Sequence, residues 1–208
     1  IPRGCDPKVF NTDSPNSEWL EDWYREFPQT KNKIILTLPT RISQWKGVDS
    51  FIELIASMKD LNFHALVVGP TSSKKQKYLS ELKDKVDEKG ISNFITFTGS
   101  RNDISNIYKI SDIVYNLSIK PEPFGRTTIE ALSSGAKVIG WNHGGTKEIL
   151  EELFPHGLVD LNDIESLKLK TLEISSKNFQ SPKPNTFLSE RMIDLTISLY
   201  QELINKSL

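Results

Sequence analysis

Apolar runs of strand length alternate with segments of helical periodicity along most of this chain, and no other feature limits the fold as strongly. Strands that are continuously apolar are buried on both faces, and strands alternating with helices predict βαβ units in a parallel sheet. We therefore predict an α/β protein with a Rossmann-like open parallel sheet of about six strands and helices on both faces. The expected strands are 33–38, 63–69, 94–99, 112–118, 137–141 and a short one at 157–160, and the expected helices are 48–59, 77–90, 103–111, 126–135, 146–154, 163–177 and 187–205. Residues 1–32 are expected to be irregular, with one short helix in the Trp-rich stretch "SEWLEDWYREF".

Composition excludes several classes of protein. The 208 residues carry a net charge of −1, which gives no indication of a nucleic-acid partner. The single cysteine, Cys5, excludes an internal disulfide framework and is typical of a reducing compartment. No apolar run approaches the length of a transmembrane segment. The chain opens on Ile, so we expect a processed chain or a piece of a longer one.

The loops that follow the strands are where a ligand would bind, because open α/β sheets bind ligands beyond the carboxyl ends of their strands. The loop after the first expected strand, "PTRISQWKG", places Arg41 and Lys46 just before a helix. The planar guanidinium of an arginine, the mobile charge of a lysine and the free N–H groups of a helix N-terminus together favour binding of an anion. A solvated loop with two cations is the alternative, and these residues alone leave both interpretations open.

A second loop, "EPFGRTTIE", sets Glu122 and Glu130 on either side of a glycine turn that opens a helix. Pro123 disfavours helix at Glu122, and Gly125 lets the backbone turn sharply and approach a ligand closely. The N–H groups of the new helix lack intrahelical partners and favour an anion by about 0.3–1 kcal/mol. A carboxylate at Glu130 suits neighbouring hydroxyls such as a ribose diol. The helix dipole explains Glu130 without any ligand, but it explains Glu122 poorly.

Several nucleotide and metal motifs are missing. The dinucleotide fingerprint G-x-G-x-x-G and the phosphate loop G-x-x-x-x-G-K-[ST] do not occur. No Asp-x-Asp pair and no His/Cys cluster has metal-ligand spacing. We therefore expect no metal and no cofactor, and a nicotinamide-binding domain is disfavoured. Any bound phosphate would be neutralised by Arg, Lys and helix ends.

Six segments, in order, resemble the C-terminal, donor-binding domain of glycosyltransferase family 4, whose members are retaining enzymes of the GT-B fold. The segments are "IPRGCDPKVF", "TRISQWKGVDSFIEL", "VVGP", "FITFTGSRNDISNIYKISDIV", "EPFGRTTIEALSSGAKVIG" and "HGGTKEIL". The fifth carries that family's signature of two glutamates separated by seven residues. Six matches in the right order and spacing make the resemblance specific, and they cover most of the chain.

The resemblance implies a role for each matching residue. Arg41 and Lys46 would bind the donor diphosphate, Glu130 the ribose hydroxyls and Glu122 the donor sugar, so that Arg41, Lys46 and Glu122 take part in catalysis. The donor would be a UDP-, GDP- or ADP-sugar. The remaining implied donor contacts lie in the glycine turn and in a loop beside the base: Phe124, Gly125, Arg126 and Thr127, and Gly99, Ser100 and Arg101.

Two positions depart from the family pattern. Arg126 stands where an aliphatic residue is usual, and Arg3 stands where the junction segment usually has Asn. Arg126 has two possible roles. It could be an extra cation beside the diphosphate, or it could form an outward-facing or interdomain salt bridge. The residues before the signature, "SIKP", also differ from the usual Pro-Ser.

The resemblance further implies a division of the chain and an activity. Residues 1–32 would be the interdomain junction, 33–180 the nucleotide-sugar-binding domain, and 181–208 a C-terminal helix packing toward a missing N-terminal domain. The whole enzyme would be a retaining, hexosyltransferase-type glycosyltransferase in glycan, lipopolysaccharide or glycolipid synthesis. It would act on a glycan or lipid-linked acceptor, in the cytoplasm or at the inner membrane face. This half would be inactive alone, and a sugar-nucleotide epimerase or a non-catalytic nucleotide-binding partner domain remain as alternatives.

Overall fold

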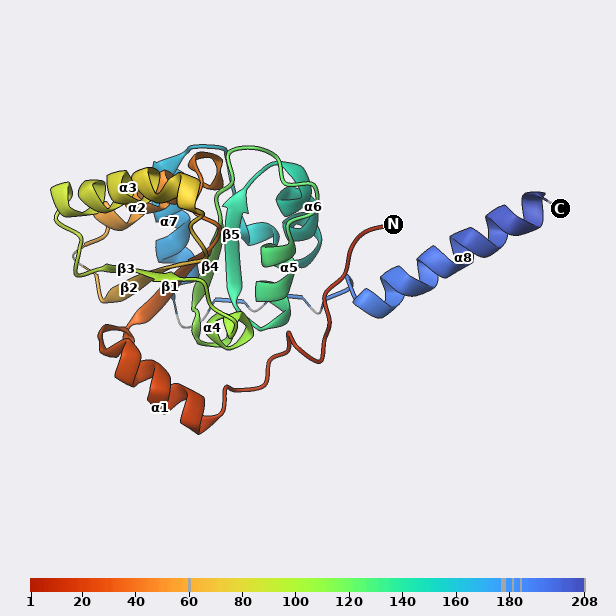
Figure 1. Cartoon of the computed structure of the whole chain (residues 1–208), viewed down its shortest axis with the longest axis horizontal. Coiled ribbons are helices and arrows are strands. Elements are labelled where there is room, and N and C mark those ends of the chain that lie inside the picture. The colour runs from red at the N-terminus through yellow and green to blue at the C-terminus, as the bar shows by residue number, and fades with distance from the viewer. Residues whose placement is uncertain (60, 177–178, 181, 184, 208) are drawn as a thin grey trace.

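The computed structural model describes residues 1–59, 61–176, 179–180, 182–183 and 185–207 of the chain. Its centre is a parallel six-stranded sheet in the order β3-β2-β1-β4-β5-β6 (Figure 1). The strands are β1 (Ile34–Pro39), β2 (Phe63–Val68), β3 (Ile95–Gly99), β4 (Ile113–Asn116), β5 (Lys137–Trp141) and β6 (Leu158–Val159). The α-helices are α1 (Ser17–Glu26), α2 (Val48–Ala56), α3 (Gln76–Glu88), α4 (Ile104–Ile110), α5 (Arg126–Ser133), α6 (Gly144–Leu153), α7 (Ile164–Ile174) and α8 (Ser189–Ser207). The Rossmann-like sheet predicted from the sequence is confirmed, including its six strands.

The order of the strands determines where a ligand can bind. The chain runs from β1 outward through β2 to β3, and then returns to place β4 on the other side of β1. β1 and β4 pair in parallel, with Leu36 opposite Ile113 and Thr37 opposite Val114. The loops that leave these two strands therefore diverge to opposite sides, and such a switch point opens a crevice at the carboxyl edge of the sheet.

Both faces of the sheet are packed, as continuously apolar strands require. Helices α2, α3 and α7 lie on one face, and α1, α4 and α5 on the other (Figure 1). Ile35 points from β1 into a small cluster with Trp23 and Phe27 of the α1 segment. Its neighbours Leu36 and Leu38 belong to the larger core cluster. The short Trp-rich helix therefore packs on the sheet, within the predicted junction segment.

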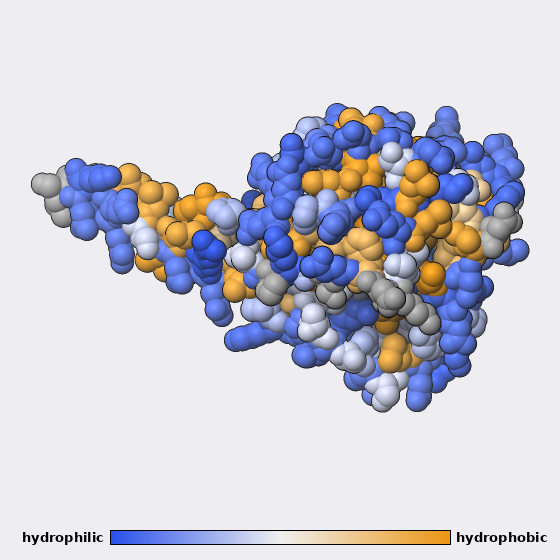
Figure 2. All heavy atoms as spheres, turned by 180° about the vertical axis from the view of Figure 1, so that it is seen from behind, coloured by the Kyte–Doolittle hydropathy of each residue, from blue (hydrophilic) through white to orange (hydrophobic). Residues whose placement is uncertain are grey.

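A segment near the N-terminus pairs with the segment that precedes α8. Cys5 bridges Leu188 in parallel, with Cys5 N donating to the Phe187 carbonyl over 3.1 Å and Ser189 N donating to the Cys5 carbonyl over 3.0 Å. The helix α8 begins there and projects away from the body (Figure 1). Apolar side chains run along it (Figure 2), and they are about half exposed: Ile193, Leu195, Ile197, Leu199, Tyr200, Leu203 and Ile204. Among the helices of the described residues, none is long and apolar enough to cross a membrane.

Helix α6 begins two residues earlier than its expected start at residue 146, because both glycines of "HGGTKE" belong to its first turn. Gly145 N donates to the Glu122 carbonyl over 2.8 Å. A Cβ on Gly145 would lie 2.3 Å from the Phe124 carbonyl oxygen. A glycine is therefore needed where this helix start approaches the "EPFG" loop.

Candidate functional site

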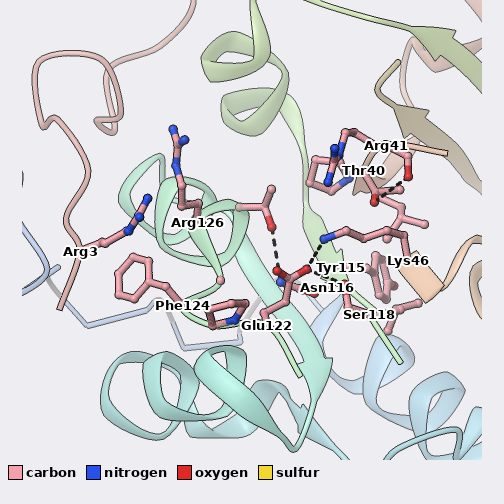
Figure 3. A pocket seen from close by; sticks show the side chains of 16 residues that line it. Arg3, Thr40, Arg41, Lys46, Tyr115, Asn116, Ser118, Glu122, Phe124 and Arg126 are labelled. Atoms are coloured by element: carbon pink, nitrogen blue, oxygen red, sulfur yellow. Dashed lines mark hydrogen bonds and ion pairs between the residues drawn. The ribbon is translucent and has the colours of Figure 1, made fainter. Parts of the chain in front are cut away.

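A cavity of about 400 Å³ opens at the carboxyl ends of β1 and β4, at the switch point of the sheet (Figure 3). Strand ends and the loops after them supply most of its wall. The lining residues are Arg3, Leu38, Pro39, Thr40, Arg41, Lys46, Tyr115, Asn116, Leu117, Ser118, Glu122, Pro123, Phe124, Gly125, Arg126 and Thr127. Seven of the eleven residues proposed from the sequence, Arg41, Lys46, Glu122, Phe124, Gly125, Arg126 and Thr127, thus line one cavity.

Lys46 and Glu122 form an ion pair within this cavity (Figure 3). Glu122 Oε1 accepts from Lys46 Nζ and also from Ser118 Oγ, the latter over 2.7 Å. The Lys46 ammonium also lies 4.1 Å from the centre of the Trp45 ring, a cation–π contact. The carboxylate is therefore held in place before any ligand enters.

A tight backbone contact brings Lys46 to this position. Lys46 ends a short 3₁₀ turn, Gln44–Lys46, and Gly47 follows with φ 77°. A Cβ at Gly47 would lie only 1.9 Å from the Leu117 carbonyl oxygen. Ile119 N donates to the Trp45 carbonyl over 2.8 Å. The loop after β1 is thereby fastened to the loop after β4.

The Glu122 loop is supported from its other side by the start of α6. His143 Nε2 donates to the Ser118 carbonyl over 2.8 Å. A Cβ on Gly144, which has φ 57°, would lie 2.9 Å from the Glu122 backbone nitrogen and oxygen. In this structure His143 thus has a structural contact that holds the loop carrying Glu122.

Gly125 caps the N-terminus of α5 in the left-handed region, with φ 89°. The helix begins at Arg126 as predicted, and Glu122 lies in the loop before it. The first N–H groups of α5 lack intrahelical acceptors and carry the positive end of its dipole, so they favour an anion. Gly125, Arg126 and Thr127 all border the cavity. A helix start, Lys46 and Arg41 therefore converge on one space.

Glu130 is not among the residues that line the cavity. The residue is buried, at 8% exposure. Glu130 Oε1 accepts from Arg126 Nη2 over 3.1 Å, and Oε2 accepts from the Tyr108 hydroxyl over 3.4 Å. Burial raises the pKa of Glu130, and the Arg126 charge opposes that rise. Arg126 thus forms a salt bridge within the domain, with a buried carboxylate one turn further along its own helix.

Gly99, Ser100 and Arg101 lie at the end of β3 and also do not line the cavity. Arg101 pairs with Asp103 over 2.7 Å and with Glu26 over 2.9 Å, and its guanidinium lies over the Trp23 ring. The hydrogen bonds that Arg101 donates to Asp103 are the main cause of its raised pKa. In this structure the Arg101 side chain links the β3 loop to α1.

Sequence reasoning did not propose four polar or charged lining residues: Arg3, Thr40, Asn116 and Ser118. Asn116 is the last residue of β4, and its amide donates to Thr128 Oγ1 over 3.1 Å. Asn116 and Ser118 could have been proposed from the sequence, because they are polar residues at the end of an apolar strand. Within the described residues, no group of three His, Cys, Asp or Glu side chains could hold a metal ion.

The fold and the site define a Rossmann-like domain of the type found in GT-B glycosyltransferase structures. Residues 21–187 match the family model described as glycosyl transferases group 1. The chain therefore belongs to this family.

Three relatives illustrate the likeness. The mannosylfructose-phosphate synthase of Agrobacterium fabrum is 30% identical over 152 residues, which is 70% of this chain and 32% of that protein. A glycosyltransferase structure from Rickettsia africae matches 97% of this chain and 56% of its own, at a TM-score of 0.85 and 26% identity. The Anabaena protein HepE, solved with UDP and glucose, matches 83% of this chain and 48% of its own, at a TM-score of 0.71 and 26% identity. The chain thus spans about a third of that curated relative and about half of each solved one.

Proposed function

We propose that this chain is the domain that binds a nucleoside diphosphate sugar in a retaining glycosyltransferase of family 4. The observation that carries the proposal is the single cavity in which Arg41, Lys46, Glu122 and the start of α5 meet. Its position at the switch point between β1 and β4 is where open α/β sheets bind nucleotides. The HepE structure, which contains UDP and glucose, supports a nucleotide-sugar ligand.

In this proposal the diphosphate binds between Arg41, Lys46 and the N-terminus of α5. Negative charge grows on the diphosphate as the sugar leaves, so these groups stabilise the transition state more than the ground state. Glu122, held by Ser118 and Lys46, binds hydroxyls of the donor sugar. Glu130 binds the ribose hydroxyls, and the Gly99–Arg101 loop lies by the base.

Glu130 must become accessible for its proposed role. Its carboxylate is bonded to Arg126 and Tyr108 in the free structure. The Arg126 side chain is 71% exposed, so it can rotate away or share the carboxylate when ribose enters. Ribose binding thus exchanges an ion pair that is exposed only on its arginine side for hydrogen bonds to two hydroxyls.

We propose that the remainder of the enzyme is a preceding domain that supplies the acceptor site, where a glycan or lipid-linked hydroxyl would bind. The apolar stripe of α8, which includes Ile193 and Ile197, would pack on that domain. This chain alone would then bind the nucleotide and transfer little or no sugar. Sugar transfer by the isolated chain would contradict the proposal that the acceptor site lies on the preceding domain.

Calorimetric titration of this chain with UDP, GDP and ADP, and then with their sugars, tests the proposal. We expect one diphosphate to bind more tightly than its monophosphate, because Arg41, Lys46 and the helix start act on the second phosphate. No binding of any of the three would contradict the proposal. Product analysis with the full-length enzyme would separate glycosyl transfer from the second candidate, sugar-nucleotide epimerisation.

A further inference from the structure

The cavity holds more positive charge than a diphosphate requires. Four of its lining residues are cations, Arg3, Arg41, Lys46 and Arg126, whereas Glu122 is its one lining acid among the described residues. Glu122 pairs with Lys46, and Glu130, which does not line the cavity, pairs with Arg126. No ion pair within 4.0 Å joins Arg3 or Arg41 to an acid of the part of the chain that the structure describes. A diphosphate bound at Arg41 and Lys46 therefore leaves Arg3 without a counter-charge.

The four cations divide into two groups in space. Figure 3 shows Arg3 and Arg126 on the side of the cavity where Phe124 lies, and Arg41 and Lys46 on the opposite side. Both residues of the first group are exposed, and both line the cavity. Arg126 uses Nη2 for Glu130, which leaves other N–H donors of its guanidinium for a second acceptor. Two guanidinium groups on one side of the cavity can thus accept an anion separate from the diphosphate.

The backbone of Arg3 is held in place, so its position at the cavity is not that of a free terminus. A Cβ on the next residue, Gly4, would lie 2.2 Å from the Leu188 carbonyl carbon. Cys5 then pairs with Leu188. Arg3 also borders a neighbouring hollow together with Glu152 and Arg191, but no ion pair within 4.0 Å links it to Glu152.

We propose that Arg3 and Arg126 form a second anion subsite, which binds a carboxylate or phosphate group carried by one of the two substrates. This inference rests on the proposed function, because it needs the diphosphate to occupy Arg41 and Lys46. Guanidinium forks match both groups in geometry, so the shared chemistry is a planar or tetrahedral oxyanion. The anion comes either from an acidic donor sugar or from a phosphorylated acceptor.

Two pairs of ligands distinguish these sources. The donor pair is tested with the 208-residue chain, and the acceptor pair with the full-length enzyme, because the proposed function assigns the acceptor site to the preceding domain. UDP-glucose and UDP-glucuronic acid differ by one carboxylate on the donor sugar, and calorimetry compares their affinities. Glucose and glucose 6-phosphate differ by one phosphate, and NMR titration compares them with UDP at saturation. If the nucleotide panel selects GDP or ADP, the corresponding ligands replace these.

We expect the acidic member of at least one pair to bind about tenfold more tightly than its neutral counterpart. Arg3→Gln should remove most of that preference while changing UDP affinity by less than about twofold. Arg126→Gln should remove it as well, and Arg25→Gln, an exposed arginine on α1 remote from the cavity lining, should leave it intact. Preference for the carboxylate identifies the donor as the source, and preference for the phosphate identifies the acceptor.

Two results would overturn the subsite while leaving the proposed function intact. The first is UDP binding with no preference for either acidic ligand. The second is a preference that survives both Arg3→Gln and Arg126→Gln in variants with native NMR spectra. A failure of every nucleotide to bind would instead overturn the proposed function, and the subsite with it.

Discussion

The guanidinium of Arg126 donates to the carboxylate of Glu130 over 3.1 Å, one turn further along α5. One partner lies at the surface and the other in the interior, because the Arg126 side chain is 71% exposed and that of Glu130 is 10% exposed. Burial raises the pKa of Glu130, and the Arg126 charge acts against that rise. Arg126 therefore favours the ionised form of the carboxylate that we propose as the ribose ligand.

Replacing Arg126 by Leu should destabilise the fold at neutral pH and less so in acid. Because the folded pKa of Glu130 is raised, ionising this group costs folding free energy as the pH rises through the unfolded and then the folded pKa. Losing the Arg126 charge increases that cost by about 0.5–1 kcal/mol, a value typical of an exposed ion pair. Urea unfolding at pH 7.5 and 4.5 measures the difference. In a Glu130→Gln background the effect of Arg126→Leu should disappear, and a loss equal at both pH values would contradict the assignment.

Gly47 should tolerate a side chain much less well than Gly90. Both have positive φ, 77° and 65°, so alanine costs about 1–2 kcal/mol at either position. At Gly47 the new Cβ would also meet the Leu117 carbonyl oxygen at 1.9 Å, whereas at Gly90 nothing lies within 4 Å. We expect Gly47→Ala to cost about 3 kcal/mol or more in the free energy of unfolding. Because the clash also displaces Lys46, nucleotide affinity should fall in this variant and stay unchanged in Gly90→Ala. Equal stability of the two variants would disprove the proposed packing.

His64 should make the fold less stable in mild acid. Its ring is buried in β2, with Nε2 joined to Thr96 Oγ1 over 2.8 Å. Burial, and then the charge of Lys33, lower its pKa from 6.5 to about 4. The unfolded chain thus binds a proton more readily between these values, and stability falls by on the order of 3 kcal/mol as the pH drops from 6.5 to about 4.

Urea midpoints measured from pH 7 to pH 4 test this, with His64→Gln as the comparison. Gln keeps a polar group for Thr96 and does not titrate, so the variant should lose less stability across this window. Parallel pH profiles would show that other groups cause the acid sensitivity.

The local part of the site could be predicted from the sequence, and its long-range part could not. The spacing of Glu122, Gly125 and Glu130 is a property of one turn and one helix, and short-range rules predict it. The contact of Arg126 with Glu130 is also local. The sequence alone, however, does not decide whether an exposed arginine binds a phosphate or forms a salt bridge.

Contacts between distant segments depend on the order of the strands, which no local pattern specifies. Arg3 reaches the cavity because Cys5 pairs with Leu188 at the other end of the chain. Arg101, predicted to lie by the base, pairs with Glu26 of α1, which is 75 residues away in sequence. The predicted position of Arg101 beside the base came from the motif in its own loop. None of the six matching segments includes α1, so the ion pair with Glu26 could not be predicted from them.

Lys46 and Glu122 should be strongly coupled in nucleotide binding. We expect Lys46→Ala to lower diphosphate affinity about tenfold to a hundredfold, the range for losing a hydrogen bond between charged groups. Part of that loss comes from leaving the Glu122 carboxylate unneutralised beside the diphosphate, since Lys46 is its ion-pair partner. Glu122→Gln added to Lys46→Ala should therefore restore part of the affinity, with a coupling of about 1 kcal/mol or more.

Calorimetry with the diphosphate alone measures the affinities of the wild type, the two single variants and the double variant, without the contribution of the sugar. Lys147→Ala is the matched control, because this half-buried lysine of α6 pairs with Glu151 and does not line the cavity. Unchanged affinity in Lys46→Ala would remove Lys46 from the diphosphate site. Strictly additive effects of Lys46→Ala and Glu122→Gln would show that the ion pair is not formed when the nucleotide is bound, and would place the two side chains in separate parts of the site.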